Sequence, residues 1–221
     1  MSSADHRISQ ADRAEALRLT PVSRETGARL DRFVELLMDT QQHTNLIAPS
    51  TIPTIWTRHI SDSLQLLPLA PTARTWIDLG SGAGFPGLII ACALTNEPGA
   101  IVHLVESVGK KANFLREAVR HIGAPAEVHA VRIEEFVKNF SARPDVVTAR
   151  ALAPLDKLLG LAAPLLNKGA QGLFLKGQHV EAELTEASKC WNIEAELVPS
   201  QTSPQSRVVV VRKIERRRSK R

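Results

Sequence analysis

Tyrosine is missing from this sequence, only two cysteines occur, and Phe and Trp together make up 4% of the 221 residues. Cys92 and Cys190 lie far apart in the chain, so they provide neither a disulfide framework nor a CxxC metal pair. The scarcity of aromatic residues argues against a module that recognises single strands mainly by stacking bases on aromatic side chains. The two isolated cysteines indicate a reducing compartment, and we expect the protein in the cytoplasm.

Long apolar runs are also missing, because no stretch reaches the length needed to span a membrane. Residues 1–12 are polar and carry Asp5 and Asp12, where a secretory signal needs an apolar stretch. The sequence therefore predicts neither secretion nor membrane insertion. It indicates nothing about subunit contacts, and a monomer is the simplest expectation.

Positive charge is concentrated at the C-terminal end. Residues 212–221 carry a net charge of +6, whereas the whole chain carries +5, so residues 1–211 sum to −1. A terminal run of this kind is either a solvated end or a tail that binds RNA. We keep Arg216, Arg217 and Arg218 as RNA-binding candidates and treat 214–221 as a basic tail.

The rest of the chain divides into two parts by its hydrophobic pattern. Residues 1–70 are predicted to be helical, since Leu30, Phe33, Val34 and Leu37 recur at the spacing of one helix face. A loop is expected around 45–53, followed by a helix that ends near Pro68. From residue 71 to 213, short apolar runs alternate with amphipathic segments. The strands are expected at 75–79, 101–105, 127–131, 145–149, 172–175, 194–198 and 207–212, and the helices near 87–95, 109–122, 155–166 and 180–190.

This alternation predicts an α/β fold with a largely parallel seven-stranded sheet, helices on both of its faces and an N-terminal helical extension. The last two strands have only 199–206 between them, which is too short for a crossover helix. They are therefore expected to form an antiparallel hairpin at one end of the sheet.

The first predicted strand ends in Asp78-Leu-Gly80-Ser-Gly82-Ala-Gly84-Phe-Pro-Gly87, directly before an apolar helix. Glycines in such a turn let the backbone approach a ligand, and the helix after them offers free amides. The next strand ends in Glu106, an acid placed to accept both ribose hydroxyls of a nucleoside. Asp-x-Gly-x-Gly-x-Gly with this second acid resembles S-adenosylmethionine-dependent methyltransferases with a class I, Rossmann-like fold. A packing turn and a nicotinamide cofactor site remain as alternatives.

The remaining strand ends supply further site candidates. Ile133 and Glu134 follow the third strand and are placed to contact an adenine, although the same residues suit an ordinary helix start. Arg150 follows the fourth strand and Lys176 ends the fifth, where a cation is difficult to explain by packing. His59 and Asp62 stand at i, i+3 spacing, which indicates either a structural pair or an RNA contact.

Two absent signals narrow the chemistry. Enzymes that methylate the exocyclic amino groups of bases resemble one another in an Asn/Asp-Pro-Pro-aromatic sequence after the fourth strand, and this chain lacks it there. Methylation of carbon 5 of a pyrimidine needs a cysteine nucleophile, and neither cysteine lies where that adduct would form. The acceptor is therefore expected to carry a usable lone pair, so that positioning and electrostatics suffice. We expect no His and carboxylate cluster for metal catalysis and no metal.

Several phrases together resemble one family, the bacterial small-subunit ribosomal RNA methyltransferase G family, also called glucose-inhibited division protein B. They are Asn45-Leu46, Arg58-His59-x-x-Asp62-Ser-Leu64, 78–87, Glu106-Ser-x-Gly-Lys110-Lys111, Phe114-Leu115, Arg132-Ile-Glu-Glu135, Asp145-Val-Val-Thr-Ala-Arg-Ala151 and Leu175-Lys-Gly177.

The resemblance implies transfer of a methyl group from S-adenosylmethionine to N7 of a guanine in 16S rRNA near the decoding centre, on free rRNA or the 30S subunit. It implies cofactor contacts at Gly80, Phe85, Ile133, Glu134 and Arg150, with Glu106 at the ribose. We add Asp78 and Gly82 to this set.

Arg150 and Lys176 are assigned to cofactor or RNA backbone rather than to proton transfer. With Lys176, the residues Arg58, His59, Lys110 and Lys111 are the RNA-binding candidates outside the tail. A methyltransferase for small molecules or proteins, and an inactive RNA-binding module, remain the competing hypotheses.

Overall fold

The computed structural model describes residues 8–217 and begins with a series of helices. These are α1 (Gln10–Leu19), α2 (Arg24–Gln41), the 3₁₀ helix η1 (Pro49–Thr54), the π-helix η2 (Trp56–Ser61), the short α3 (Asp62–Leu64) and the 3₁₀ turn η3 (Leu67–Leu69). Ser23 starts α2 by accepting a hydrogen bond from the Thr26 amide at 3.1 Å. The predicted loop at 45–53 is partly wrong, because Pro49 opens η1 at its first helical position.

Seven strands alternate with helices after residue 74. In chain order they are β1 (Thr75–Leu79), α4 (Gly87–Ala93), β2 (Ile101–Val105), α5 (Gly109–Ile122), β3 (Ala126–His129), α6 (Ile133–Asn139), β4 (Val146–Arg150), α7 (Leu155–Leu166), β5 (Gln171–Lys176), α8 (Val180–Cys190), β6 (Trp191–Pro199) and β7 (Arg207–Arg216). The sheet order is β3-β2-β1-β4-β5-β7-β6. Five strands are parallel, and β7 runs antiparallel to both β5 and β6. The predicted fold class and terminal hairpin are confirmed.

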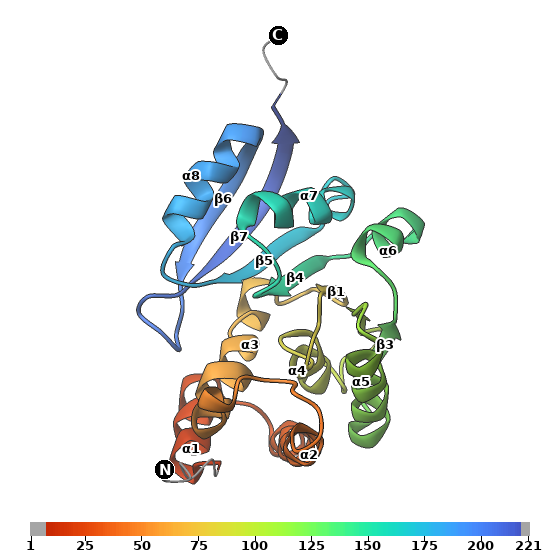
Figure 1. The fold of residues 1–221 in the computed structure, drawn as a ribbon, viewed down its shortest axis with the longest axis vertical. Coiled ribbons are helices and arrows are strands. Elements are labelled where there is room, and N and C mark those ends of the chain that lie inside the picture. Colours follow the sequence, from red (N-terminus) through yellow and green to blue (C-terminus); the bar gives the residue numbers. More distant parts are fainter. Residues whose placement is uncertain (1–7, 218–221) are drawn as a thin grey trace.

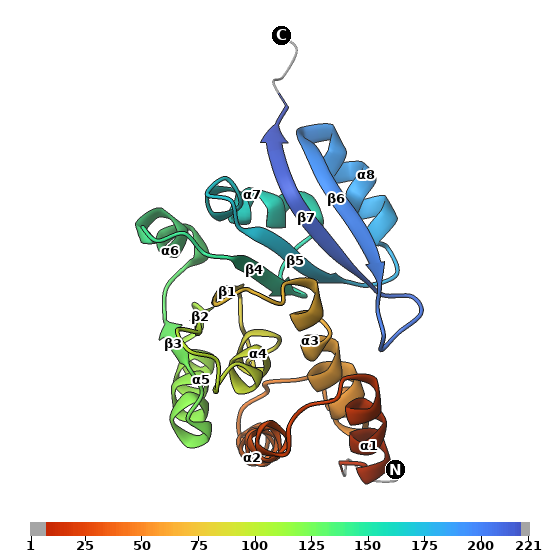
Figure 2. The same ribbon diagram turned by 180° about the vertical axis from the view of Figure 1, so that it is seen from behind.

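Helices cover both faces of the sheet (Figure 1 and, from behind, Figure 2). One face packs against α6, α7 and α8, and the other packs against α4, α5 and the N-terminal helices. Because the five strands run parallel, their carboxyl ends form one edge where loops meet. The glycine loop after β1 and the turn after β4 lie at this edge, since β1 and β4 are neighbours.

The N-terminal helices share one hydrophobic core with the sheet and are not a separate unit. Phe33 of α2 is fully buried, and its ring lies 5.6 Å from Phe85 and 6.3 Å from Phe114, measured between centroids. Phe85 belongs to the glycine loop and Phe114 to α5. The segment predicted as an extension therefore forms the wall against which the glycine loop packs.

The C-terminal boundary differs from the prediction. Strand β7 continues through Arg216, which pairs with Trp191 of β6, so part of the segment predicted as a basic tail is strand. The reason is the length of β6, which begins at Trp191 and offers backbone partners to the end of β7. Arg217 still donates from its amide to the Cys190 carbonyl at 2.9 Å, while Arg218 lies outside the described residues.

The described part of the chain, 8–217, contains no helix that is both long and apolar enough to cross a bilayer.

Replacing Phe33 with alanine should lower the free energy of unfolding by about 3–5 kcal/mol, because it opens a cavity between α2, the glycine loop and α5. Denaturant unfolding would measure the change. Val108→Ala is the control, since the Val108 side chain is 49% exposed and its loss should cost no more than about 0.5 kcal/mol. Equal effects of the two substitutions would contradict the shared core.

Candidate cofactor and substrate site

The loop between β1 and α4 is built on glycines that other residues cannot replace without strain. Gly80 has a φ of +72°, and a Cβ atom added there would lie 2.7 Å from Cδ1 of Leu152. A Cβ on Gly87 would lie 2.5 Å from Leu104 and 2.6 Å from Cβ of Asp78. At Gly82, in contrast, a Cβ would meet nothing nearer than 3.8 Å, so the backbone there faces open space. The loop is therefore tightly packed at Gly80 and Gly87 and leaves space beside the backbone of Gly82.

Asp78 lies beneath this loop and holds it from inside the protein. One carboxylate oxygen accepts a hydrogen bond from the Gly87 amide at 3.1 Å, and the other accepts one from the Thr148 hydroxyl at 3.0 Å. Burial raises the pKa of Asp78 to about 6, against the opposing effect of these hydrogen bonds. The side chain ties β1, α4 and β4 together, and it does not line either of the cavities described below.

A cavity of about 220 Å³ lies above the glycine loop, and five of the residues predicted to contact the cofactor line it. The Glu106 carboxylate borders it and accepts hydrogen bonds from the Gly82 amide at 2.9 Å and the Val108 amide at 2.7 Å. Each carboxylate oxygen keeps a further lone pair for a hydroxyl group. The complete lining consists of Gly80, Gly82, Val105, Glu106, Ser107, Lys111, Ile133, Arg150, Ala151 and Leu152.

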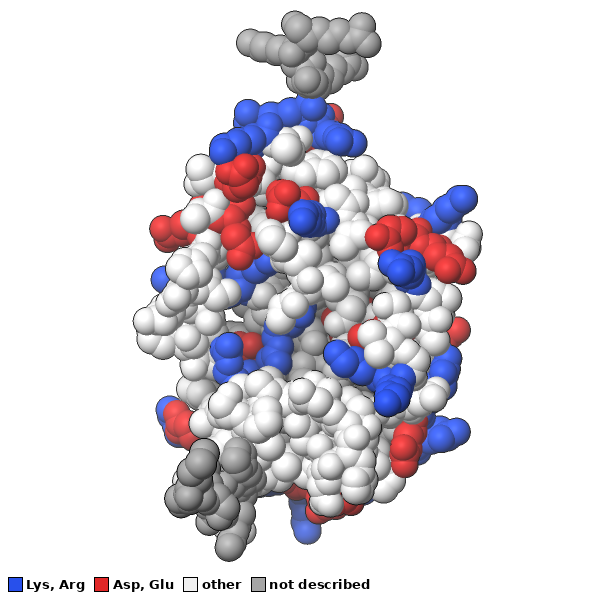
Figure 3. Space-filling view, viewed as in Figure 1, with Lys and Arg blue, Asp and Glu red and all other residues white. Residues whose placement is uncertain are grey.

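A larger cavity of about 520 Å³ lies between the N-terminal helices and the ends of β4 and β5. Its lining includes Arg58, His59, Asp62, Lys176 and Glu183, and it shares Arg150, Ala151 and Leu152 with the smaller cavity. The space-filling view shows a hollow in the middle of one face, with Lys and Arg side chains in and beside it (Figure 3). The two cavities are therefore neighbours separated by the turn after β4.

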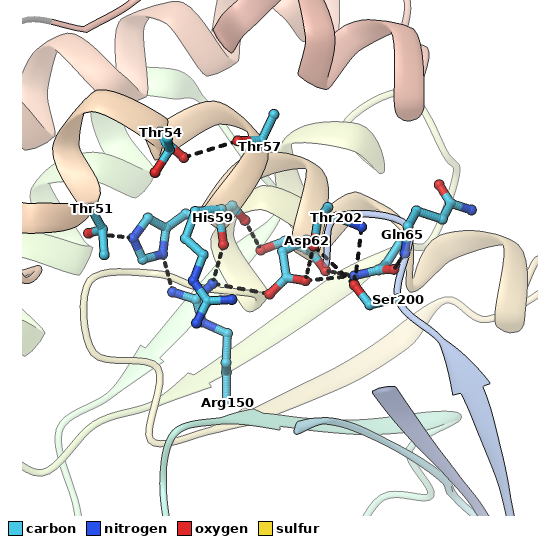
Figure 4. Close-up of polar contacts among 12 residues, drawn as sticks. Thr51, Thr54, Thr57, His59, Asp62, Gln65, Arg150, Ser200 and Thr202 are labelled. Carbon is cyan, nitrogen blue, oxygen red and sulfur yellow. Dashed lines mark hydrogen bonds and ion pairs between the residues drawn. The ribbon is translucent and has the colours of Figure 1, made fainter. Parts of the chain in front are cut away.

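Arg150 is the central side chain of this region. It rises from the end of β4 and points into η2, as Figure 4 shows. Its guanidinium donates to the Arg58 carbonyl at 3.0 Å, to Asp62 at 3.4 Å and to Nδ1 of His59. The guanidinium carbon also lies 5.3 Å from the centre of the Phe85 ring. Burial lowers the pKa of Arg150, and the negative charge of Asp62 acts in the opposite direction.

His59 is buried and neutral in this arrangement. Burial, with the nearby charges of Arg150 and Arg58, lowers its pKa to about 3. Because Nδ1 accepts from Arg150, Nε2 carries the proton and donates to the Thr51 hydroxyl at 2.9 Å. The ring stacks on Phe85 with 4.7 Å between centroids. His59 therefore positions Arg150 and Phe85, and it also lines the larger cavity.

Lys176 is also paired. Its ammonium group donates to Glu183 at 2.8 Å and to the Ala153 carbonyl at 2.6 Å. The same Glu183 oxygen accepts the Leu155 amide at 2.7 Å, where α7 begins. This ion pair therefore fixes the start of α7 at one wall of the larger cavity.

The structure brings together only part of the predicted cofactor set. Gly80, Gly82, Glu106, Ile133 and Arg150 line the smaller cavity. Three predicted members lie elsewhere. Asp78 is under the loop, the Phe85 ring packs against α2 and His59, and Glu134 is exposed outside the lining.

The RNA-binding candidates also separate. Arg58 is exposed and lines the larger cavity, whereas Lys111 lines the smaller one and Lys110 is exposed beside it. Arg216 and Arg217 are exposed at the end of β7. His59 and Asp62, which were predicted as a structural pair or an RNA contact, are connected through Arg150, which donates hydrogen bonds to both.

Sequence reasoning missed the role of Asp62 as a junction. Its carboxylate also accepts hydrogen bonds from the side-chain amide of Gln65 at 2.7 Å and from the Thr202 hydroxyl at 2.8 Å (Figure 4). The second contact joins Asp62 to the loop between β6 and β7. No sequence signal marks this contact, since Thr202 lies 140 residues from Asp62.

Sequence reasoning also missed Ala151, which has a φ of 51° although it is not glycine. This left-handed conformation is uncommon for residues with a side chain, and it lies directly between the two cavities.

Solved structures with the same architecture define the fold. An O-methyltransferase from Bacillus cereus in complex with S-adenosylhomocysteine matches 92% of this chain and 97% of its own, with a TM-score of 0.60 and 12% identity. Magnesium protoporphyrin IX methyltransferase from Synechocystis, with bound S-adenosylmethionine, matches 87% and 99%, with a TM-score of 0.54 and 13% identity. The fold is that of the class I methyltransferases.

The sequence comparisons are more specific. The family model for rRNA small subunit methyltransferase G matches residues 27–209. Ribosomal RNA small subunit methyltransferase G of a Bradyrhizobium species is 60% identical over 210 residues, covering 95% of both chains, and that of Rhodopseudomonas palustris is 57% identical over 206 residues, covering 93% and 87%. This chain belongs to the rRNA small subunit methyltransferase G family, which confirms the resemblance inferred from its motifs.

Asp78 gives the stability of the protein a testable dependence on pH. Its folded pKa of about 6 exceeds the ordinary 3.8, so the folded state binds the proton more tightly and stability falls as the pH rises from about 4 to 6. Two pH units correspond to about 3 kcal/mol as an upper limit. Asp78→Asn should remove this decline, measured as the difference in unfolding free energy between the two proteins at each pH. A constant difference from pH 4 to 6 would show that Asp78 is not protonated on folding.

Proposed function

We propose that this chain transfers a methyl group from S-adenosylmethionine to N7 of a guanine in 16S rRNA. Family membership assigns it to the S-adenosylmethionine-dependent rRNA methyltransferases. The observation that carries the atom-level proposal is the absence of a free base among the described residues that line the larger cavity. A guanine near the decoding centre is the substrate that the family resemblance implies.

The smaller cavity suits the cofactor. S-adenosylmethionine supplies an electrophilic methyl group when it is bound. The Gly82 backbone is open to a close approach, and the buried Glu106 carboxylate is aligned by the Gly82 and Val108 amides toward the ribose position. Ile133 gives an apolar surface for the adenine. The alternation of polar and apolar lining groups matches a nucleoside ligand.

The larger cavity suits an acceptor atom that has no proton to lose. His59 has a pKa of about 3, and its Nδ1 atom already accepts from Arg150. The carboxylates of Asp62 and Glu183 accept hydrogen bonds from Arg150 and Lys176. These groups are poor general bases. N7 of guanine carries a free lone pair and no proton, so positioning is sufficient for its methylation.

The charges at the cavity also favour a nucleic acid substrate. Arg58 is exposed at the rim of the larger cavity, and Lys111 and Lys110 lie at the edge of the smaller one. Cations at such positions bind phosphates and orient a strand. We place the RNA along this edge, with the 30S subunit or free 16S rRNA as the partner, and the enzyme acting as a monomer in the cytoplasm.

Replacing Glu106 with alanine should weaken S-adenosylmethionine binding by about 1.5–3 kcal/mol, the range for hydrogen bonds to a charged group, which is roughly tenfold or more in affinity. Calorimetry measures the change. Glu135→Ala is the matched control, since Glu135 is exposed on α6 and its loss should leave the affinity unchanged. An unchanged affinity in a folded Glu106→Ala protein would remove this residue from the cofactor site.

The product is expected to be N7-methylguanine at one position of 16S rRNA. Full-length protein would be incubated with labelled S-adenosylmethionine and either free 16S rRNA or 30S subunits from a strain that lacks the enzyme. Since N7 methylation makes the glycosidic bond labile, borohydride and aniline should cut the labelled RNA at one guanine.

Recovery of N6-methyladenine or 5-methylcytosine would refute the proposed acceptor. RNA binding without labelled product would support an inactive RNA-binding module, and labelling of small molecules alone would support the other competing hypothesis. The two RNA arms identify which form of the substrate is used.

A further inference from the structure

Three side chains with metal-binding atoms meet on strands β2 and β3 of the sheet. His103 belongs to β2, and Glu127 and His129 belong to the edge strand β3. The parallel register pairs His103 with Glu127 and Val105 with His129, so all three side chains project from the same face of the sheet. The sequence analysis expected no metal and no such cluster for catalysis, and it did not identify this group of residues. The signal was missed because no short spacing links His103 to β3.

The distances among the ligand atoms are close to those of a metal site. Nδ1 of His103 lies 3.0 Å from Nε2 of His129 and 3.6 Å from a Glu127 oxygen, while the other Glu127 oxygen lies 3.8 Å from Nε2 of His129. Tetrahedral zinc, with bonds of about 2.0–2.1 Å, places its ligand atoms about 3.3–3.4 Å apart. Small side-chain rotations therefore suffice to centre an ion among them.

Aromatic rings of α6 pack against one side of the cluster, and the other side is open to solvent. On one side the His129 ring lies 4.7 Å from Phe136 and the His103 ring 5.0 Å from Phe140, measured between centroids. Glu127 is 61% exposed and provides the open side.

We propose that His103, Glu127 and His129 bind one divalent transition metal ion, with zinc as the ion best suited to two imidazoles and one carboxylate. Solvent supplies the fourth ligand. Because two strands contribute ligands, the ion fastens the edge strand β3 to β2. Calcium and magnesium are disfavoured, since they prefer sites built from oxygen atoms. None of the three residues lines either cavity, and the site does not depend on the acceptor proposed above.

The alternative is that the two imidazoles only hydrogen-bond to each other, one as donor and one as acceptor. That arrangement needs no carboxylate, whereas a metal site does. Glu127 therefore distinguishes the two, and its exposure makes its replacement safe for folding.

The test measures zinc binding to the tag-free full chain by calorimetry, in a Cys190→Ser background because the exposed Cys190 thiol is itself a zinc ligand. Glu127→Gln and His103→Gln should each weaken binding roughly tenfold or more, since loss of outer-shell partners alone costs about 10–100-fold. His121→Gln is the control, because His121 is exposed on α5 and should not affect binding.

Cobalt titration provides a second readout, since a tetrahedral site gives a visible d–d spectrum that both ligand variants should lose. Zinc affinity in Glu127→Gln equal to that in His121→Gln would overturn the proposal and leave the hydrogen-bonded imidazole pair. Should His103→Gln not fold, the Glu127→Gln result alone decides. At the same zinc concentration, the thermal midpoint should rise less in Glu127→Gln than in the unsubstituted cluster, because weaker binding gives less stabilisation.

Discussion

The buried guanidinium of Arg150 sets the arrangement of the site. Removing a cation from water costs several kcal/mol of free energy unless a negative charge and hydrogen-bond acceptors compensate it. The acceptors of Arg150 come from η2 and the residue that follows it: the Arg58 carbonyl, Nδ1 of His59 and the Asp62 carboxylate. The N-terminal helices therefore have to lie over the carboxyl edge of the sheet, where they form one wall of the larger cavity.

The same contacts bring the C-terminal hairpin into the site. Asp62 accepts from Arg150 and also from Thr202 of the loop between β6 and β7, and Gln65 accepts the Gln201 amide at 2.9 Å. Three segments that are remote in sequence therefore meet at one carboxylate. Hydrogen bonds to Asp62 and Gln65 therefore hold the loop between β6 and β7 against the N-terminal wall of the cavity.

Local patterns were sufficient for most of the sheet and its helices. The bounds of α5, α7 and α8 match their predictions because strong periodicity ends at clear signals, such as Gly123, which closes α5 with a φ of 63°. The glycine loop, Glu106 and Ile133 were found because motif residues follow strand ends, and parallel strands bring those ends to one edge.

Other features depend on contacts that no local pattern records. The family resemblance implies a cofactor contact at Phe85, and no local pattern indicates that its ring packs against Phe33 of α2. The contact of Asp62 with Arg150 joins residues 88 positions apart, and the His103 cluster arises from strand register. The π-helical form of η2, which places His59 and Asp62 toward the same guanidinium, has no signature in residue type.

The turn after β4 shows how the two cavities become one reaction site. Arg150 anchors the start of this turn in the N-terminal wall, while Leu152 anchors its other end against Gly80 of the cofactor loop. Ala151 bridges these fixed ends in the left-handed conformation, which costs an L-residue about 1–2 kcal/mol. Such a cost persists only where neighbouring contacts over-determine the backbone. Both cavities share this turn, so under the proposed function the same three residues set the positions of the methyl donor and of the acceptor.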